Sequence, residues 1–141
     1  MTNRTFAIIK PDAIKKNNTG LIFDHILKTG FNVISAKLIK MTLAQAEGFY
    51  AIHSERPFFA ELTNFMSSGQ CMVLALEKDN AVSAWRETIG ETNPNEAQEG
   101  TIRRLFASSI GENAVHGSDS DENAQKEIAF FFPETELITN N

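Results

Sequence analysis

Four short apolar runs, with helix-like segments between them, constrain the fold of this chain of 141 residues more than any other feature. Their length and their content of β-branched and aromatic residues indicate buried strands. The runs are Thr5–Ile9, Phe31–Ile39, Gln70–Leu76 and Ile128–Phe132. We therefore predict an α+β sandwich in which helices cover a four-stranded sheet.

Caps and breakers place the predicted helices between these strands. Pro11 ends the first strand and can open a helical turn, and Gln45 lies at capping-box spacing from Thr42. The predicted helices are Leu21–Lys28, Thr42–Ile52, Pro57–Met66, Ala81–Ile89 with Asn80 as its N-cap, and a short one from about Asp121. The tail, Glu134–Asn141, is expected to pack loosely or to fray.

Length and composition exclude several classes of protein. The length predicts one domain over residues 1–141, and the net charge of −5 argues against a general nucleic-acid binder, which is usually basic. No apolar run approaches the length of a membrane span. Cys71 is the only cysteine, so no intrachain disulfide is possible, and we expect it to pack as a small apolar side chain. A cytoplasmic location fits these features.

The segment Gly90–Gly111 is the least regular part of the chain. A loop of this length inside a compact domain is usually functional or disordered. Because it carries Ile102, Leu105 and Phe106, we predict an ordered excursion that presents Thr92 and Arg103.

The heptapeptide Asn113–Asp119 is predicted to form a loop followed by a helix start. Gly117 permits a tight turn, and Ser118 or Ser120 is a suitable N-cap. His116 can then point out of the chain, and a neutral imidazole is a nucleophile at physiological pH. The alternative interpretation is that His116 is an ordinary histidine of a surface loop.

Cationic and polar residues recur at the predicted ends of elements. Arginine forks suit phosphate oxygens and lysine supplies a point charge, so such a set can line a phosphate site. The P-loop, dinucleotide-binding and protein-kinase signatures are absent from the sequence, and so is a zinc-type spacing. A covalent histidine is then one route to phosphoryl transfer. The set is Lys10, Arg86, Thr92, Arg103, Asn113 and His116.

The heptapeptide resembles the active-site signature of nucleoside diphosphate kinases. Further blocks of that family follow in its order, so the resemblance covers nearly the whole chain. It implies a ferredoxin-like α+β fold with a four-stranded antiparallel sheet. The blocks are Lys10–Asp12, Glu55–Phe59, Gly90–Pro94, Gly100–Arg103 and Asn113–Asp119.

Matching the blocks residue by residue implies a role for each site residue. His116 resembles the nucleophile, supported by Ser118 and Glu127, and Phe58 resembles the base-stacking aromatic, opposite Ile110. Asn113, together with Lys10, resembles the sugar contact. The residues that resemble the phosphate-contacting set are Lys10, Tyr50, Arg86, Thr92 and Arg103.

The resemblance also implies the reaction. The γ-phosphate of a nucleoside triphosphate passes to a nucleoside diphosphate through a phosphohistidine, in a ping-pong mechanism, with Mg²⁺ held mainly by the nucleotide phosphates and by no dedicated protein site. One stacked aromatic discriminates bases weakly, so broad base and sugar tolerance is expected. The family forms homo-oligomers, tetramers or hexamers. Gln98-Glu99 and Arg104-Leu105 depart from its usual pattern and affect loop packing or subunit contacts.

Two alternatives stay open at this point. One is a catalytically silent nucleotide-binding or interaction protein on the same fold, against which the intact Lys10, Arg103 and His116 argue. The other is an RNA-binding module on a similar sheet. The acidic charge, and the lack of a strand motif that combines aromatic and basic residues, argue against it.

Overall fold

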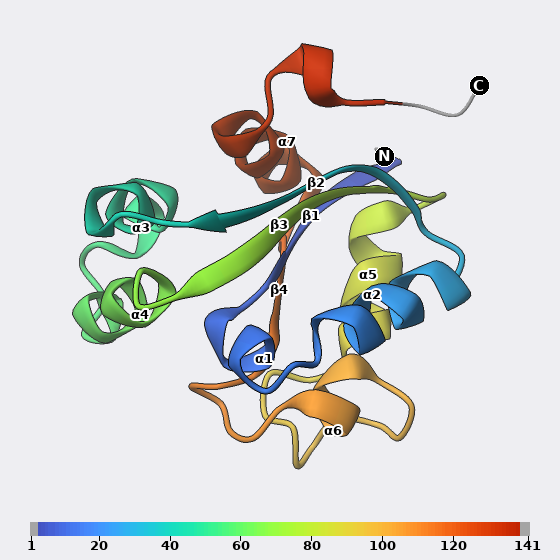
Figure 1. Cartoon of the computed structure of the whole chain (residues 1–141), viewed down its shortest axis with the longest axis horizontal. Helices are drawn as coiled ribbons and strands as arrows, with labels where there is room; N and C mark the ends of the chain where they lie inside the picture. The colour runs from blue at the N-terminus through green and yellow to red at the C-terminus, as the bar shows by residue number, and fades with distance from the viewer. Residues whose placement is uncertain (1–2, 139–141) are drawn as a thin grey trace.

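A four-stranded antiparallel sheet in the order β2-β3-β1-β4 forms the centre of the protein (Figure 1). The computed structural model describes residues 3–138. The α+β fold with helices over one antiparallel sheet, predicted from the sequence, is confirmed. The strands are β1 (Arg4–Ile9), β2 (Asn32–Lys40), β3 (Gln70–Glu77) and β4 (Val115–Gly117).

The helices begin where the sequence places caps. Pro11 occupies the first turn of α1, and Thr42 and Gln45 form a capping box, with hydrogen bonds of 2.9 and 3.0 Å. Asn80 also lies at an N-cap, but its φ is 53° and its side chain makes no cap hydrogen bond. The helices are α1 (Pro11–Lys15), α2 (Thr19–Lys28), α3 (Leu43–Phe49), η1 (Ala51–His53), α4 (Phe59–Met66), α5 (Ala81–Ile89), α6 (Ile102–Phe106), α7 (Asp121–Phe131) and η2 (Glu134–Glu136).

The sheet buries apolar side chains on both faces because successive residues of a strand point to opposite sides. Ala7 and Ile9 pack with side chains of α1, α2 and α5, while Phe6 and Ile8 pack with side chains of α3, α4 and α7. Cys71 is fully buried in the second of these cores, as predicted for a small apolar side chain.

The predicted fourth strand, Ile128–Phe132, is wrong, because these residues lie at and just beyond the end of helix α7. Ala124, Ile128 and Phe132 are buried while Ala129 and Phe130 are exposed, which is the period of a helix. A short apolar run does not distinguish the two structures by itself. The fourth strand is instead β4, which pairs with β1 inside the heptapeptide predicted as a loop.

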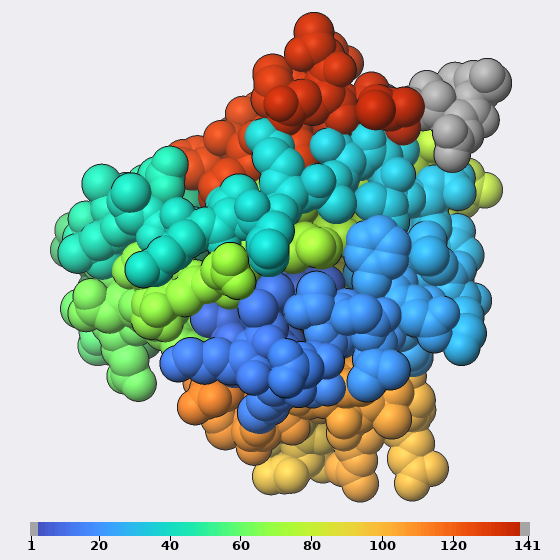
Figure 2. Space-filling view, viewed as in Figure 1, coloured from blue at the N-terminus to red at the C-terminus, as the bar shows by residue number. Residues whose placement is uncertain are grey.

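The irregular segment after Gly90 is ordered, as predicted, and the tail packs against the fold up to Ile138. The irregular segment after Gly90 contains helix α6, which Thr101 caps, and it forms the lower end of the molecule in Figure 2. The tail does not fray up to Ile138, because Leu137 packs on the second core and the Ile138 N–H donates to the Ile34 carbonyl at 2.9 Å. Residues 139–141 lie outside the described part of the chain.

Candidate active site

His116 lies in the middle of β4, directly opposite Ile8 of β1. Strand alternation places Val115 in one core and turns the His116 ring to the other face. There the ring centroids of Phe6, Phe49 and Tyr50 lie 5.5–6.1 Å from the imidazole. Only 17% of the His116 side chain is exposed. The predicted loop placement and the alternative of an ordinary surface histidine are therefore both wrong.

Two further contacts fix the backbone around His116. The Trp85 Nε1–H donates to the His116 carbonyl at 3.1 Å. A Cβ atom at position 117 would lie 2.8 Å from a carbon of the Trp85 ring, so this close approach requires Gly117. The buried tryptophan thus holds β4 at a set distance from α5.

A carboxylate from α7 fixes the orientation of the imidazole. Glu127 Oε1 lies 2.7 Å from His116 Nε2 and also accepts a hydrogen bond of 2.9 Å from Ser118 Oγ. Because a carboxylate only accepts, Nε2 carries the proton and the lone pair lies on Nδ1. Burial lowers the pKa of His116, although Glu127 partly opposes this effect. The imidazole is therefore neutral at neutral pH.

Lys10 is held at the end of β1 by a buried amide. Its Nζ donates to Asn113 Oδ1 at 2.9 Å, and the two residues are only 9% and 4% exposed. Burial, followed by the positive charge of Arg103, lowers the pKa of Lys10 to about 8. Lys10 is therefore buried and paired, although it follows directly after the last residue of β1.

Arg103 anchors the cationic part of the site. It donates to the carbonyls of Gly90 and Val115 at 3.0 Å each, while its buried Nε has no hydrogen-bond partner within residues 3–138. Burial, followed by the charge of Arg86, lowers the pKa of Arg103 to about 10. For both Lys10 and Arg103, the neighbouring charge with the largest influence on the pKa is another cation. Such a group of cations favours the binding of an anion.

Arg86 and Thr92 complete the predicted phosphate set on the exposed side. Arg86 Nη1 is 3.5 Å from the Ser118 carbonyl, and the Thr92 carbonyl accepts from Asn113 Nδ2 at 3.4 Å. Arg86, Thr92 and Arg103 line one cleft of about 430 Å³. Lys10 lines a second cleft, which shares Thr92 with the first, so the cations predicted to contact phosphate lie in two adjoining clefts.

Tyr50 borders the imidazole with a buried hydroxyl. No hydrogen-bond partner for this hydroxyl occurs within residues 3–138. Burial, followed by the charge of Glu127, raises the pKa of Tyr50, so the hydroxyl keeps its proton and is available as a donor. Tyr50, His116 and Glu127 line a cavity of about 120 Å³.

The second cleft, of about 620 Å³, is suited to a flat apolar group. Phe58 and Ile110, which are 47% and 58% exposed, line it together with Leu62, Lys10 and Thr92. Lys10 and Thr92 connect this cleft to the cationic residues. The side chains of Phe58 and Ile110 are therefore accessible to a ligand in this cleft.

Three residues near the site received no role from the sequence. Phe49 packs against the imidazole, Trp85 holds its backbone, and Asp12 accepts a hydrogen bond of 3.0 Å from the Ala114 N–H. The sequence offered two signals for Asp12, its place beside Lys10 at a predicted strand end and its place in the block Lys10–Asp12, but neither indicated a role. Contacts across the fold of this kind leave no local pattern in the sequence.

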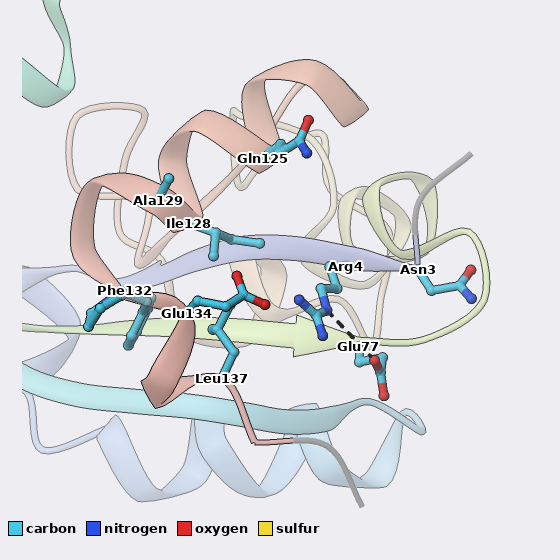
Figure 3. A pocket seen from close by; sticks show the side chains of 10 residues that line it. Asn3, Arg4, Glu77, Gln125, Ile128, Ala129, Phe132, Glu134 and Leu137 are labelled. Atoms are coloured by element: carbon cyan, nitrogen blue, oxygen red, sulfur yellow. Dashed lines mark ion pairs between the residues drawn. The ribbon is translucent and has the colours of Figure 1, made fainter. Parts of the chain in front are cut away.

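A groove of about 590 Å³ lies away from these residues, under helix α7 (Figure 3). Ile128, Phe132 and Leu137 form its apolar part, and Arg4 pairs with Glu77 at 3.8 Å across its rim. None of the predicted site residues lines this groove.

Of the departures from the family pattern, Arg104-Leu105 lies at the outer side of the loop, whereas Gln98 lines the cleft together with Arg86, Thr92 and Arg103. Arg104 Nη1 donates to the Asn95 carbonyl at 3.2 Å, and Leu105 is 54% exposed. Arg104 therefore ties α6 to the preceding loop and does not enter the cleft lined by Arg86, Thr92 and Arg103.

Comparisons with known proteins agree with this architecture. The nucleoside diphosphate kinase family model matches residues 3–137. The nucleoside diphosphate kinase of Salinibacter ruber is 54% identical over 139 residues, 99% of this chain and 98% of that protein. That of Geotalea uraniireducens is 56% identical over 135 residues, 96% of this chain and 98% of that protein.

Solved structures of the same class share the fold. The Aquifex aeolicus nucleoside diphosphate kinase superposes with a TM-score of 0.95 at 42% identity, covering 98% of this chain and 100% of that chain. The Halobacterium salinarum nucleoside diphosphate kinase, in complex with CDP, superposes with a TM-score of 0.93 at 31% identity, covering 100% and 94%.

The antiparallel α+β sandwich described above is thus the ferredoxin-like fold of nucleoside diphosphate kinases of known structure. This chain belongs to the nucleoside diphosphate kinase family. The predictions of this family and of an enzyme of this class are confirmed. Within residues 3–138, no helix combines the length and the apolar character needed to cross a membrane.

Proposed function

We propose that this protein transfers the γ-phosphate of a nucleoside triphosphate to a nucleoside diphosphate through a phosphohistidine at His116. The observation that carries the proposal is the 2.7 Å contact of Nε2 with Glu127, which leaves Nδ1 as the nucleophile. Ser118 binds the same carboxylate oxygen and keeps it in place. The family membership supports the reaction class.

The reaction takes two in-line displacements at one site. In the first, Nδ1 bonds to the γ-phosphorus while the bond to the oxygen bridging the β- and γ-phosphates breaks, and the diphosphate leaves with that oxygen. In the second, a terminal oxygen of the acceptor's β-phosphate attacks the phosphorus and the nitrogen–phosphorus bond breaks. Glu127 stabilises the positive charge that the imidazole carries while it is phosphorylated.

The cations of the site neutralise the transferred group. Lys10, Arg86 and Arg103 contact phosphate oxygens, and the protonated hydroxyls of Tyr50 and Thr92 donate to them. The partnerless buried Nε of Arg103 and hydroxyl of Tyr50 support this role, since buried polar groups normally have partners. A bound phosphate would supply the missing acceptors.

The nucleoside occupies the cleft of about 620 Å³. The base stacks on Phe58 with Ile110 opposite, and Asn113 and Lys10 contact the sugar. The Halobacterium salinarum relative in complex with CDP supports a nucleoside diphosphate as ligand. Stacking without an extensive set of hydrogen bonds gives broad base and sugar tolerance.

Mg²⁺ fits this site as a companion of the nucleotide phosphates. Residues 3–138 contain no group of three or more His, Cys, Asp or Glu side chains placed to hold a metal ion. The residues facing the phosphates are mostly cationic, so the ion enters on the nucleotide and neutralises its charge there. The absence of a dedicated protein site for the ion remains a prediction.

We further propose that the chain forms a single domain over residues 1–141. We also propose that it assembles into a cytoplasmic homo-oligomer, either a tetramer or a hexamer. This oligomer binds neither nucleic acid nor membrane. An exposed aliphatic residue on edge strand β2 and two on α2 support the oligomer, since exposed edges invite pairing. They are Leu38, Leu21 and Leu27, which are 53%, 57% and 50% exposed. Sedimentation equilibrium at micromolar concentration tests this state.

The test of the central proposal is phosphate loading. Incubation with [γ-³²P]ATP and Mg²⁺, without an acceptor, should label the peptide that contains His116, and added GDP should discharge the label as GTP. The bond should be labile in acid and stable in base. His116→Ala should lose loading and turnover, while His25→Ala, a histidine on α2, should keep both. Label at His25 or His53, or normal turnover by His116→Ala, would contradict the proposal.

A further inference from the structure

The backbone makes a strained turn immediately before the candidate nucleophile. The Val115 N–H donates to the Asn113 carbonyl at 2.8 Å, and Ala114 between them has a φ of 72°. This is a γ-turn of the rarer, strained kind, and alanine disfavours positive φ. Such a conformation persists only where surrounding contacts hold it.

Two groups from the end of β1 and the start of α1 hold this turn. The Lys10 N–H donates to the Ala114 carbonyl at 2.8 Å, and the Ala114 N–H donates to Asp12 Oδ2 at 3.0 Å. Asp12 is only 3% exposed, and Ala114 is fully buried. Asp12 is thus the side chain that accepts the amide hydrogen of the strained residue.

The turn lies in the chain between Asn113, the proposed sugar contact, and His116, the proposed nucleophile. On one side, Asn113 Oδ1 accepts from Lys10 Nζ at 2.9 Å. On the other side, β4 begins, and His116 is fixed independently by its pairing with Ile8 and by the bond from Trp85 to its carbonyl. A relaxed turn would therefore displace Asn113 much more than His116.

We propose that Asp12 is a positioning residue for the nucleotide: its carboxylate, by accepting the Ala114 N–H, holds the strained turn so that Asn113 stays paired with Lys10 in the cleft. This inference rests on the proposed function, in which Asn113 and Lys10 contact the sugar. Asp12 acts through the backbone and touches neither the phosphate nor the imidazole.

The proposal predicts a split between binding and chemistry. Asp12→Ala should raise the KM for ADP by about tenfold, a size typical of residues that orient a ligand contact, while kcat and the loading of His116 at saturating ATP stay within about threefold. Ala114→Gly added to Asp12→Ala should restore part of the KM, because glycine keeps positive φ without support. In an Asn113→Ala background, Asp12→Ala should add little.

Asp12→Asn separates the hydrogen bond from the charge of Asp12, which also lies near Lys10. The amide oxygen still accepts from Ala114, so the KM should stay within about threefold of the unsubstituted protein. An Asn variant as impaired as Asp12→Ala, or additive effects of Asp12→Ala and Asn113→Ala, would overturn the proposal. Thermal unfolding of each variant checks that it is folded.

The control is Asp24→Ala, which removes an exposed carboxylate on α2 that pairs with Lys28. Loss of transfer in the unsubstituted protein would refute the proposed function itself. Normal transfer in the unsubstituted protein and in Asp24→Ala, with an unchanged KM in Asp12→Ala, would refute only the role of Asp12.

Discussion

Helix α7 contributes to two regions that differ in their charged residues. Toward β4 it presents Glu127, which lies 2.7 Å from His116, whereas Gln125, Ile128 and Ala129 line the groove of Figure 3. That groove has a volume of about 590 Å³, close to the 620 Å³ of the cleft beside Phe58. Volume alone therefore does not identify the site.

Buried charge distinguishes the two regions. Lys10 and Arg103 are each 9% exposed, and a neighbouring cation disfavours the charged form of each. At the groove, the side chains of Arg4 and Glu77 are 36% and 30% exposed and lie 3.8 Å apart. Keeping cations together in a buried place costs free energy. A fold that tolerates this cost supplies a site for an anion.

The largest expected effect comes from exchanging one arginine in each region. Arg103→Lys removes a planar group that donates to two carbonyls, so kcat/KM should fall by about 10²–10³-fold. Arg4→Lys should change kcat/KM by less than about twofold, because an ion pair that is about one-third exposed, with its atoms 3.8 Å apart, contributes little. Steady-state kinetics, with thermal unfolding to exclude misfolding, measures both. If Arg103→Lys and Arg4→Lys lowered kcat/KM by the same factor, the proposed functional difference between the two regions would be wrong.

A smaller effect is expected for the carboxylate of α7. Glu127→Gln keeps the shape but weakens the stabilisation of the phosphorylated imidazole, so transfer should slow by about 10–100-fold with a detectable phosphoenzyme. The matched change at the groove, Glu134→Gln, should leave the rate unaltered. If Glu127→Gln transferred phosphate as fast as the unsubstituted protein, the supporting role would be wrong.

Outside a central pH window, kcat/KM is expected to fall by about tenfold per pH unit. kcat/KM should fall as the pH drops through the pKa of His116, which lies below 6.5, because the protonated ring has no lone pair to attack with. It should also fall as the pH rises through about 8, where Lys10 loses its charge. A bound phosphate stabilises the charged lysine, so the alkaline limb of kcat should lie at higher pH. An alkaline limb that persists in Lys10→Arg would exclude Lys10 as its source.

Changing the base tests the cleft beside Phe58. Acceptor efficiencies for ADP, GDP, CDP and UDP should differ by less than about a thousandfold, roughly 4 kcal/mol, because stacking on Phe58 favours every base. Phe58→Ala should weaken all four by a similar factor, corresponding to about 1–3 kcal/mol. A larger spread among the bases would indicate hydrogen-bond readout in the cleft.

The sequence predicted much of the fold and the membership of the site. Periodicity and caps placed β1, β2, β3 and most helices, because these signals are local. The cations and His116 were predicted by their motifs, and the structure places the cations in two adjoining clefts. β4 escaped prediction because three residues are too few to show a pattern, and the end of α7 was mistaken for a strand because a short apolar run fits both periods.

What the sequence determined by itself is the chemistry available: one family signature, three cations, a histidine and its carboxylate, in an acidic chain. Only the tertiary structure decided that His116 is a strand residue with Nε2 against Glu127, that Lys10 and Arg103 are both buried, and that Asp12 accepts a hydrogen bond from Ala114. The physical reason is separation along the chain. Asp12 and Ala114 are 102 residues apart, and Lys10 and Asn113 are 103 apart, so only the pairing of β1 with β4 brings them into contact.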